Sequence, residues 1–132
     1  KNNPCPEILT VAVKTERSKI ANNPNVVKVV MNSKNEALYF SRHPIPFLRE
    51  GGSEMELYRH WGIYAFKRAP IEKFVSMPES KLEKCEKLEQ LRALENGMKI
   101  SVLITDEFSI GIDTPEDLED AKKFLDSNRA NF

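Results

Sequence analysis

Apolar residues recur along this chain with two periods, one typical of strands and one typical of helices. Short runs rich in β-branched and aromatic residues predict strands at residues 8–14, 26–31, 37–42, 58–67 and 99–105. Helical spacing predicts helices over residues 70–75 and 82–94 and from Pro115 onward. The polar turn at 32–36 indicates an antiparallel hairpin, and the run at 58–67, apolar on both faces, a central strand. The alternation predicts an α/β fold with a mixed sheet.

The predicted helix at 82–94 carries charge where it should be apolar. Its apolar positions recur every third residue and so spiral around a wide arc: Leu82, Cys85, Leu88, Leu91 and Leu94. Glu89 and Arg92 fall within or beside that arc, where a bare charge is costly. Two possibilities stay open at this point: an internal Glu89–Arg92 ion pair, or a polar binding site that uses Glu89 and Gln90. Asn96-Gly97 predicts a left-handed cap at the end of this helix.

The last helix has a strong start signal. Thr114 is suited to the N-cap and Pro115 to the first helical position, and a stripe of Leu118, Ala121 and Leu125 is expected to face a core. Because Thr114 serves as the cap, the carboxylate of Asp113 is left for another role. It suits Mg²⁺ bound by one or two carboxylates plus phosphates, or an ordinary turn in which the aspartate bonds its own backbone.

Composition limits the classes of function. The 132 residues, 40% of them hydrophobic, are enough for a single domain over residues 1–132. Twenty basic residues balance twenty acidic ones, which argues against a nucleic-acid partner. No apolar run is long enough for a transmembrane helix, so no membrane partner is expected. The two cysteines fit no metal-ligand spacing, and a cytoplasmic location is the simplest expectation.

Two strand segments offer further candidates for binding. With period-two alternation, His60, Gly62 and Tyr64 share one face, and the glycine leaves a notch beside two polar rings. The alternative is a core histidine bonded to the backbone. At the end of another strand, Arg42 precedes Pro44-Ile45-Pro46 and could bind a carboxylate in bidentate fashion, or be an ordinary exposed arginine.

Taken together, these segments closely resemble one family, the 3-deoxy-manno-octulosonate (KDO) cytidylyltransferases, or CMP-KDO synthetases. The resemblance covers nearly all of the chain in order, including the segment at 25–30 ahead of the hairpin. It rests on four motifs: residues 37–42 with Pro44-Ile45-Pro46, Arg59-His60-Trp61-Gly62-Ile63-Tyr64, residues 88–97, and Asp113-Thr114-Pro115-Glu116-Asp117-Leu118.

The resemblance implies a fold and a reaction. The fold is the mixed α/β sheet of nucleotide-diphospho-sugar transferases (GT-A or Rossmann-like), here its C-terminal half. The reaction transfers CMP from CTP to the 2-hydroxyl of KDO, giving CMP-KDO and pyrophosphate for lipopolysaccharide synthesis. By motif position the sugar acid is expected to meet Arg42, His60, Tyr64, Glu89 and Gln90. Asp113 matches the Mg²⁺-binding, catalytic aspartate.

One departure from the family is large. Nothing in the chain supplies a glycine-rich, lysine-bearing phosphate loop between a strand and a helix, so the N-terminal nucleotide-binding half is expected to be absent. The fragment alone is then expected to keep sugar-site residues, to show no turnover, and to form a homodimer. Two alternatives stay open: a different CMP-sugar synthetase, such as the sialic acid type, or a non-catalytic dimerisation or binding module.

Overall fold

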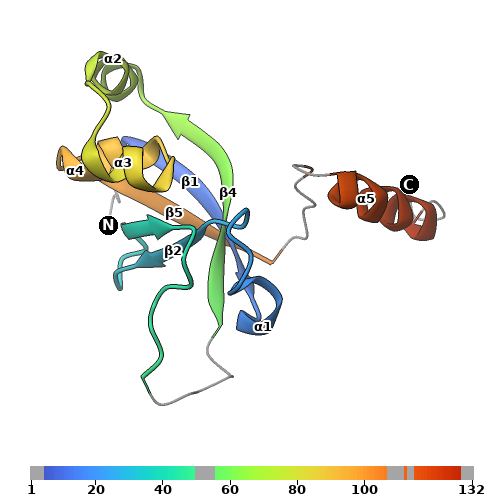
Figure 1. Ribbon diagram of the computed structural model, residues 1–132. Helices are drawn as coiled ribbons and strands as arrows, with labels where there is room; N and C mark the ends of the chain where they lie inside the picture. The colour runs from blue at the N-terminus through green and yellow to red at the C-terminus, as the bar shows by residue number, and fades with distance from the viewer. Residues whose placement is uncertain (1–4, 50–55, 107–111, 113–114, 129–132) are drawn as a thin grey trace.

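A five-stranded mixed sheet forms the centre of the protein in the computed structural model, which describes residues 5–49, 56–106, 112 and 115–128 (Figure 1). The strands lie in the order β3-β2-β4-β1-β5. β1 and β5 run parallel, and the other neighbouring pairs are antiparallel. Their bounds are β1 Ile8–Thr15, β2 Lys28–Met31, β3 Ala37–Ser41, β4 Leu57–Phe66 and β5 Ile100–Thr105.

The strand predictions are confirmed, with shifts of one or two residues at most ends. β2 and β3 pair as the predicted antiparallel hairpin, and Asn35 takes the left-handed conformation in its turn. β4 is central, with β2 on one side and β1 on the other. This arrangement brings the segment around His60 and Tyr64 into the middle of the sheet.

The helix predicted over 70–75 is confirmed and is longer, whereas the one predicted over 82–94 is divided in two. The helices are α1 Arg17–Ile20, α2 Arg68–Ser76, α3 Lys81–Glu86, α4 Gln90–Glu95 and α5 Pro115–Asn128. The prediction of one continuous helix over 82–94 is wrong, because Lys87 adopts a left-handed conformation with φ 55° and ψ 48° and separates α3 from α4.

Both helices of this pair have well-defined ends. Ser80 and Glu83 form a reciprocal capping box at the start of α3. The predicted left-handed cap at the end of α4 is confirmed at Gly97, which has a φ of 72°. The Gly97 amide donates to the Leu94 carbonyl and the Met98 amide to the Ala93 carbonyl, the pattern of a Schellman motif.

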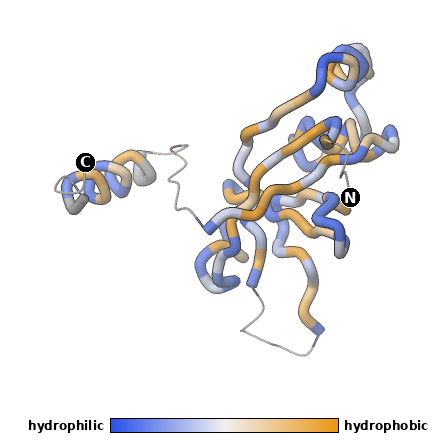
Figure 2. Tube along the Cα trace, turned by 180° about the vertical axis from the view of Figure 1, so that it is seen from behind, coloured by the Kyte–Doolittle hydropathy of each residue, from blue (hydrophilic) through white to orange (hydrophobic). Residues whose placement is uncertain are grey.

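One face of the sheet forms the core together with α4. Leu91 and Ala93 of α4, with Leu88 just before it, pack against apolar residues of the strands: Ile8, Ala12, Val29, Ala37, Phe40, Ile100 and Val102. Hydrophobic residues accordingly follow the strands through the middle of the sheet (Figure 2). The short connection between α3 and α4 is thereby held over the sheet.

α5 does not fulfil the predicted core-facing role within this chain. Ala121 is buried, but Leu118 and Leu125 are 43% and 55% exposed. Figures 1 and 2 both show α5 apart from the sheet. The amphipathic pattern therefore predicts the helix correctly, but its apolar side does not pack on the sheet of this chain. Among the described residues, no helix is long and apolar enough to cross a membrane.

Candidate functional site

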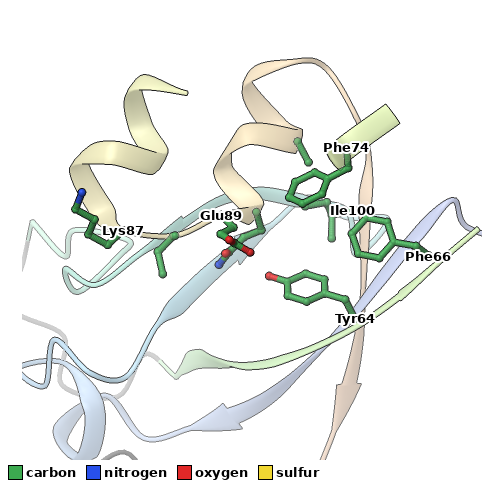
Figure 3. Close-up of a pocket in the computed structure, with 9 residues that line it drawn as sticks. Tyr64, Phe66, Phe74, Lys87, Glu89 and Ile100 are labelled. Atoms are coloured by element: carbon green, nitrogen blue, oxygen red, sulfur yellow. The ribbon is translucent and has the colours of Figure 1, made fainter. Parts of the chain in front are cut away.

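A pocket of about 200 Å³ opens between the end of β4 and the connection from α3 to α4 (Figure 3). Phe66 and Phe74 and the aliphatic side chains of Leu88, Ala93 and Ile100 make its lining partly apolar. The polar lining residues are Tyr64, Lys87, Glu89 and Gln90. The structure therefore brings three of the predicted substrate-binding residues, Tyr64, Glu89 and Gln90, to one cavity.

Three polar side chains of the pocket have hydrogen-bonding groups that no described residue satisfies. The buried Tyr64 hydroxyl has no hydrogen-bond partner among the residues that the structure describes. Within the described part of the chain, no hydrogen bond is made by the side chain of Glu89, which is exposed, or by that of Gln90, which is only 9% exposed. Figure 3 shows the Glu89 carboxylate and the Tyr64 hydroxyl directed toward each other. Because buried polar groups in proteins are almost always hydrogen-bonded, this arrangement is suited to a polar ligand.

The electrostatics of the pocket keep Tyr64 in its phenol form. Burial raises the pKa of Tyr64 far above its ordinary value of 10; the Thr10 hydroxyl opposes this with a smaller effect, and the negative charge of Glu89 adds the smallest contribution, which also raises it. A neutral phenol can donate one hydrogen bond and accept another. Tyr64 and Gln90 thus offer donors, and Glu89 offers acceptors.

His60 is not among the residues that line the pocket, but it contacts one of them. It is buried, and its ring lies 5.4 Å from that of Tyr64 and 4.8 Å from that of Phe40. Its Nε2 lies 2.9 Å from the hydroxyl of Thr10, which donates its own proton to the Ile63 carbonyl at 2.7 Å. His60 Nε2 is therefore the donor of this pair. Burial lowers the pKa of His60 to about 4, so the ring is neutral at pH 7.

A β-bulge gives β4 its local shape. Thr10 pairs with Tyr64 and the next residue, Val11, with Trp61, so Gly62 and Ile63 have no partner on β1. The predicted open space at Gly62 exists, since a β-carbon there would meet nothing within 4 Å. Gly62 is exposed and is not among the residues that line the pocket.

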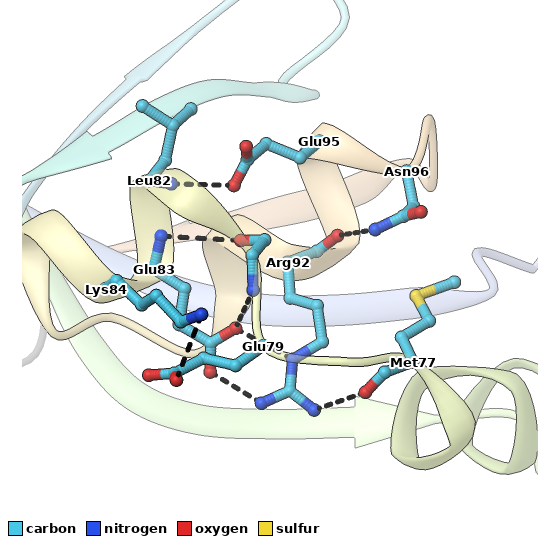
Figure 4. A network of polar contacts seen from close by, with 9 residues as sticks. Met77, Glu79, Leu82, Glu83, Lys84, Arg92, Glu95 and Asn96 are labelled. Atoms are coloured by element: carbon cyan, nitrogen blue, oxygen red, sulfur yellow. Dashed lines mark hydrogen bonds and ion pairs between the residues drawn. The ribbon is translucent and has the colours of Figure 1, made fainter.

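The hypothesis of a Glu89–Arg92 ion pair is wrong. Arg92 instead binds Glu83 through two hydrogen bonds, from Nε at 2.8 Å and from Nη2 at 2.5 Å (Figure 4). Arg92 also donates to the Met77 carbonyl and lies over the ring of Phe74 at 5.2 Å. The break at Lys87 changes which side chains face each other, so Glu89 is left to the pocket.

Arg42 does not line the pocket. Its guanidinium donates to three backbone carbonyls, those of Glu86, Lys87 and Pro24. It is half-buried rather than an ordinary exposed arginine, and its partners are the end of α3 and the turn after it. The carboxylate contact predicted for Arg42 is untested.

The predicted metal ligand, Asp113, lies outside the described residues, as does the N-cap Thr114. Among residues 5–49, 56–106, 112 and 115–128, no three histidine, cysteine or acidic side chains come together as a metal site. The magnesium prediction at Asp113 therefore stays a prediction.

Sequence reasoning missed three contributors to this region. Phe74 supplies part of the apolar lining, Thr10 orients His60, and Glu86 bonds to the end of β3. The aromatic character of the lining could have been found from Phe66, which alternates with Tyr64. Thr10 and Glu86 carry no sequence signal, since their roles depend on partners more than forty residues away.

The pocket combines an apolar lining with polar side chains that can donate and accept hydrogen bonds. An apolar lining with convergent donors and acceptors suits a molecule that has both C–H and hydroxyl surfaces. Comparison with known proteins identifies the family of this chain: a family model described as Cytidylyltransferase matches residues 1–100. The chain belongs to the cytidylyltransferase family.

Individual relatives of this cytidylyltransferase chain carry a narrower name. The 3-deoxy-manno-octulosonate cytidylyltransferase of Thermodesulfovibrio yellowstonii is 51% identical in an alignment of 123 positions that covers 89% of this chain and 48% of the relative. The enzyme of the same name from Chloroherpeton thalassium is 44% identical over 92% of this chain and 49% of the relative. The family resemblance inferred from the motifs is confirmed.

A solved structure supports the fold assignment. CMP:2-keto-3-deoxy-manno-octonic acid synthetase, solved in complex with CTP, matches with a TM-score of 0.84 at 34% identity. The match covers 96% of this chain and 52% of the solved one. The predicted nucleotide-sugar transferase fold is confirmed, and the chain spans about half the length of the curated relatives it matches.

Proposed function

We propose that this chain supplies the sugar-acid site of a cytidylyltransferase that transfers CMP from CTP to the 2-hydroxyl of KDO. In this reaction the hydroxyl oxygen bonds to the α-phosphorus, pyrophosphate leaves, and the hydroxyl proton is released. The names of the relatives support this substrate pair, and their roughly twofold greater length supports a nucleotide site formed by residues beyond this chain.

The observation that carries the proposal is the group of unused polar atoms in the pocket. The Tyr64 hydroxyl and the Glu89 carboxylate point toward each other in the pocket that Phe66 and Phe74 line, and Gln90 lines the same pocket. A sugar acid presents several hydroxyls that can donate to Glu89 and accept from Gln90 and Tyr64. These three side chains are expected to orient the sugar, and the neutral His60 contacts the ring of Tyr64.

The size of the cavity supports a single sugar rather than a nucleotide. Pockets for organic ligands commonly run from about 300 Å³ upward. A cavity of about 200 Å³ suits a smaller molecule. CTP is therefore expected to bind outside this pocket.

Mg²⁺ remains part of the proposal through the family motif. Asp113 is the residue expected to hold it, together with phosphate oxygens of the substrate. Mg²⁺ would neutralise charge on the phosphates during the displacement. Replacing Asp113 with Asn is expected to raise the Mg²⁺ concentration needed for half-maximal activity.

Assembly and location follow the same resemblance. We expect a homodimer that acts in the cytoplasm and whose product enters lipopolysaccharide synthesis. The exposed apolar side chains Leu118 and Leu125 of α5 are compatible with burial against a second subunit. Sedimentation equilibrium of the protein measures the oligomeric state directly.

The reaction is tested by measuring pyrophosphate release from the protein expressed from its complete reading frame. CTP with KDO is expected to give a Mg²⁺-dependent signal, and CTP with N-acetylneuraminate is expected to give none. A signal with N-acetylneuraminate alone would assign the protein to the sialic acid type. Absence of turnover with either acid would favour a non-catalytic binding module.

A further inference from the structure

We propose that Arg42 and Glu86 are positioning residues that fix the turn from α3 to α4, and through it the placement of Glu89 and Gln90 in the pocket. The inference rests on the proposed function for its kinetic consequence. Its structural basis is a set of reciprocal bonds between the end of β3 and the end of α3, which we call the clasp.

The turn needs external support because its backbone is unfavourable. Lys87 has a φ of 55° and a ψ of 48°, a left-handed conformation that residues with a β-carbon rarely adopt. Its amide still bonds the Glu83 carbonyl at 2.7 Å, which closes α3. Leu88, Glu89 and Gln90 follow directly, and all three line the pocket.

Glu86 reaches from the helix to the strand. Its Oε1 accepts from the Ser41 hydroxyl at 2.6 Å, and its Oε2 accepts from the Arg42 amide at 2.9 Å. Both oxygens of the carboxylate are thus engaged at the last residue of β3 and the residue after it. These bonds fix the end of α3 over the sheet.

Arg42 completes the clasp in the opposite direction. Its Nε donates to the Glu86 carbonyl at 2.8 Å and its Nη2 to the Lys87 carbonyl at 3.4 Å. The last carbonyls of a helix have no partners within the helix, so a cation at this end satisfies them. The side chain of each residue therefore bonds the backbone of the other.

The clasp is anchored in the core of the domain. Arg42 Nη1 donates to the Pro24 carbonyl at 3.0 Å. The fully buried Lys28 donates from Nζ to the Arg42 carbonyl and to the Asn23 carbonyl, both at 2.7 Å. The end of β3 is consequently bonded to the segment at residues 23–28 on one side and to the turn between α3 and α4 on the other.

The placement of Glu89 depends on this backbone. No hydrogen bond in the described part of the chain fixes the carboxylate of Glu89, so its position follows from the path of residues 87–90. A small displacement of a binding group costs affinity in a preorganised site. Loss of the clasp is therefore expected to weaken sugar binding although Glu86 is not among the residues that line the pocket.

The test compares Glu86→Gln and Arg42→Lys in the protein expressed from its complete reading frame. Each variant is expected to raise KM for KDO at least about tenfold and to leave KM for CTP unchanged, because each loses charged hydrogen bonds at the turn. The double variant is expected to cost less than the product of the single effects, since the two residues act as one unit. Glu79→Gln is the matched control, an acidic residue just before α3 that pairs only loosely with Lys84 at 3.9 Å.

Amide hydrogen exchange provides a readout that does not depend on KDO. In Glu86→Gln, exchange at Lys87 and Leu91 is expected to accelerate about tenfold or more, while the amide of His60, bonded to the Val27 carbonyl, keeps its protection. Equal acceleration at His60, or equal rises in both KM values, would show that the clasp stabilises the fold as a whole rather than the turn, and would overturn the proposal.

Direct binding of the sugar acid by Arg42 would give a different pattern. In that case Arg42→Lys would raise KM for KDO while Glu86→Gln would not, and the clasp would be overturned. If the wild-type protein has no KDO turnover, the proposed function fails. The turn itself is then judged by exchange alone, where local acceleration supports the clasp and unchanged rates contradict it.

Discussion

Three glutamates at intervals of three residues have three different roles. Glu83 is buried in an ion pair with Arg92, Glu86 joins α3 to the end of β3, and Glu89 faces the pocket without a hydrogen bond to any described residue. The residue type and spacing are the same in each case. What differs is the surface that each side chain faces once the helix is broken at Lys87.

At Glu89 we predict a kinetic effect confined to the sugar. Glu89→Gln replaces one acceptor oxygen with a donor, and a lost hydrogen bond to a charged group costs about 1.5–3 kcal/mol. KM for KDO is expected to rise about tenfold or more, with KM for CTP unchanged. Glu72→Gln on α2, an exposed residue paired with Arg68, is the control and should alter neither constant. Equal values of KM for KDO in Glu89→Gln and wild type would remove Glu89 from the site.

At Glu83 we predict an effect on stability. The residue is 4% exposed and binds Arg92 twice, so Glu83→Gln leaves the buried end of the guanidinium without a charged partner there. The free energy of unfolding is expected to fall by about 2–3 kcal/mol, measured by urea denaturation. Glu79→Gln on the surface is expected to change it by less than about 0.5 kcal/mol. A similar small change in both variants would show that the buried pair is not stabilising.

At His60 we predict a pH dependence. Its pKa is about 4 in the folded protein and 6.5 ordinarily, because burial disfavours the charged ring. Between these values the unfolded chain binds a proton that the folded chain does not, so stability falls as the pH falls from 6.5 toward 4, by up to roughly 3 kcal/mol. The pKa of Glu83 is lowered from 4.5 by its bond to Arg92, so its contribution is lost only below that pH.

The measurement is the urea midpoint at pH 6.5, 5.5 and 4.5. His60→Gln is expected to flatten the slope across this range, whereas His43→Gln, at an exposed position, is expected to retain it. A wild-type midpoint that does not change between pH 6.5 and 4.5 would contradict a neutral, buried His60.

At the scale of elements, the end of α4 and the bulge of β4 allow a matched pair of glycine variants. Gly97 has a φ of 72°, so Gly97→Ala is expected to destabilise the protein by about 1 kcal/mol through backbone strain. Gly62 has open space around it and no such conformation, so Gly62→Ala is expected to be nearly neutral. Thermal unfolding of both variants makes the comparison, and equal melting temperatures would contradict the assignment of strain to Gly97.

The elements also show what sequence patterns can and cannot predict. The strands, the hairpin and the Gly97 cap were predictable because they depend on local periodicity and turn chemistry. The break at Lys87 was not, since lysine is no turn signal and the break is held by Ser41 at the end of β3 and by Arg42 just after it, both far away in the sequence. Glu89 and Gln90 were raised as candidates by charge within the apolar arc of the predicted helix, and the family resemblance favoured a binding site over an ion pair. The correct partner of Arg92 could not be predicted without the break in the helix.

At the scale of the whole molecule, the chain corresponds to about half the length of its relatives. β5 is the last strand at one edge of its sheet; the turn between β2 and β3 bonds to its outer side at Ser101 and Val102, and Leu103 is 54% exposed. The solved synthetase is about twice as long, with this chain matching 52% of it. The pocket is nevertheless formed by described residues of this chain alone, so sugar binding can be tested separately from catalysis.

The most direct test is a two-dimensional ¹H–¹⁵N NMR titration of the folded 132-residue chain with KDO. We predict saturable shifts concentrated at the amides of Tyr64, Leu88, Glu89 and Gln90, strongly weakened in Glu89→Gln, and none on addition of N-acetylneuraminate. Shifts centred on other residues, or an unchanged spectrum of the folded chain at saturating KDO, would contradict a sugar-acid site in this pocket.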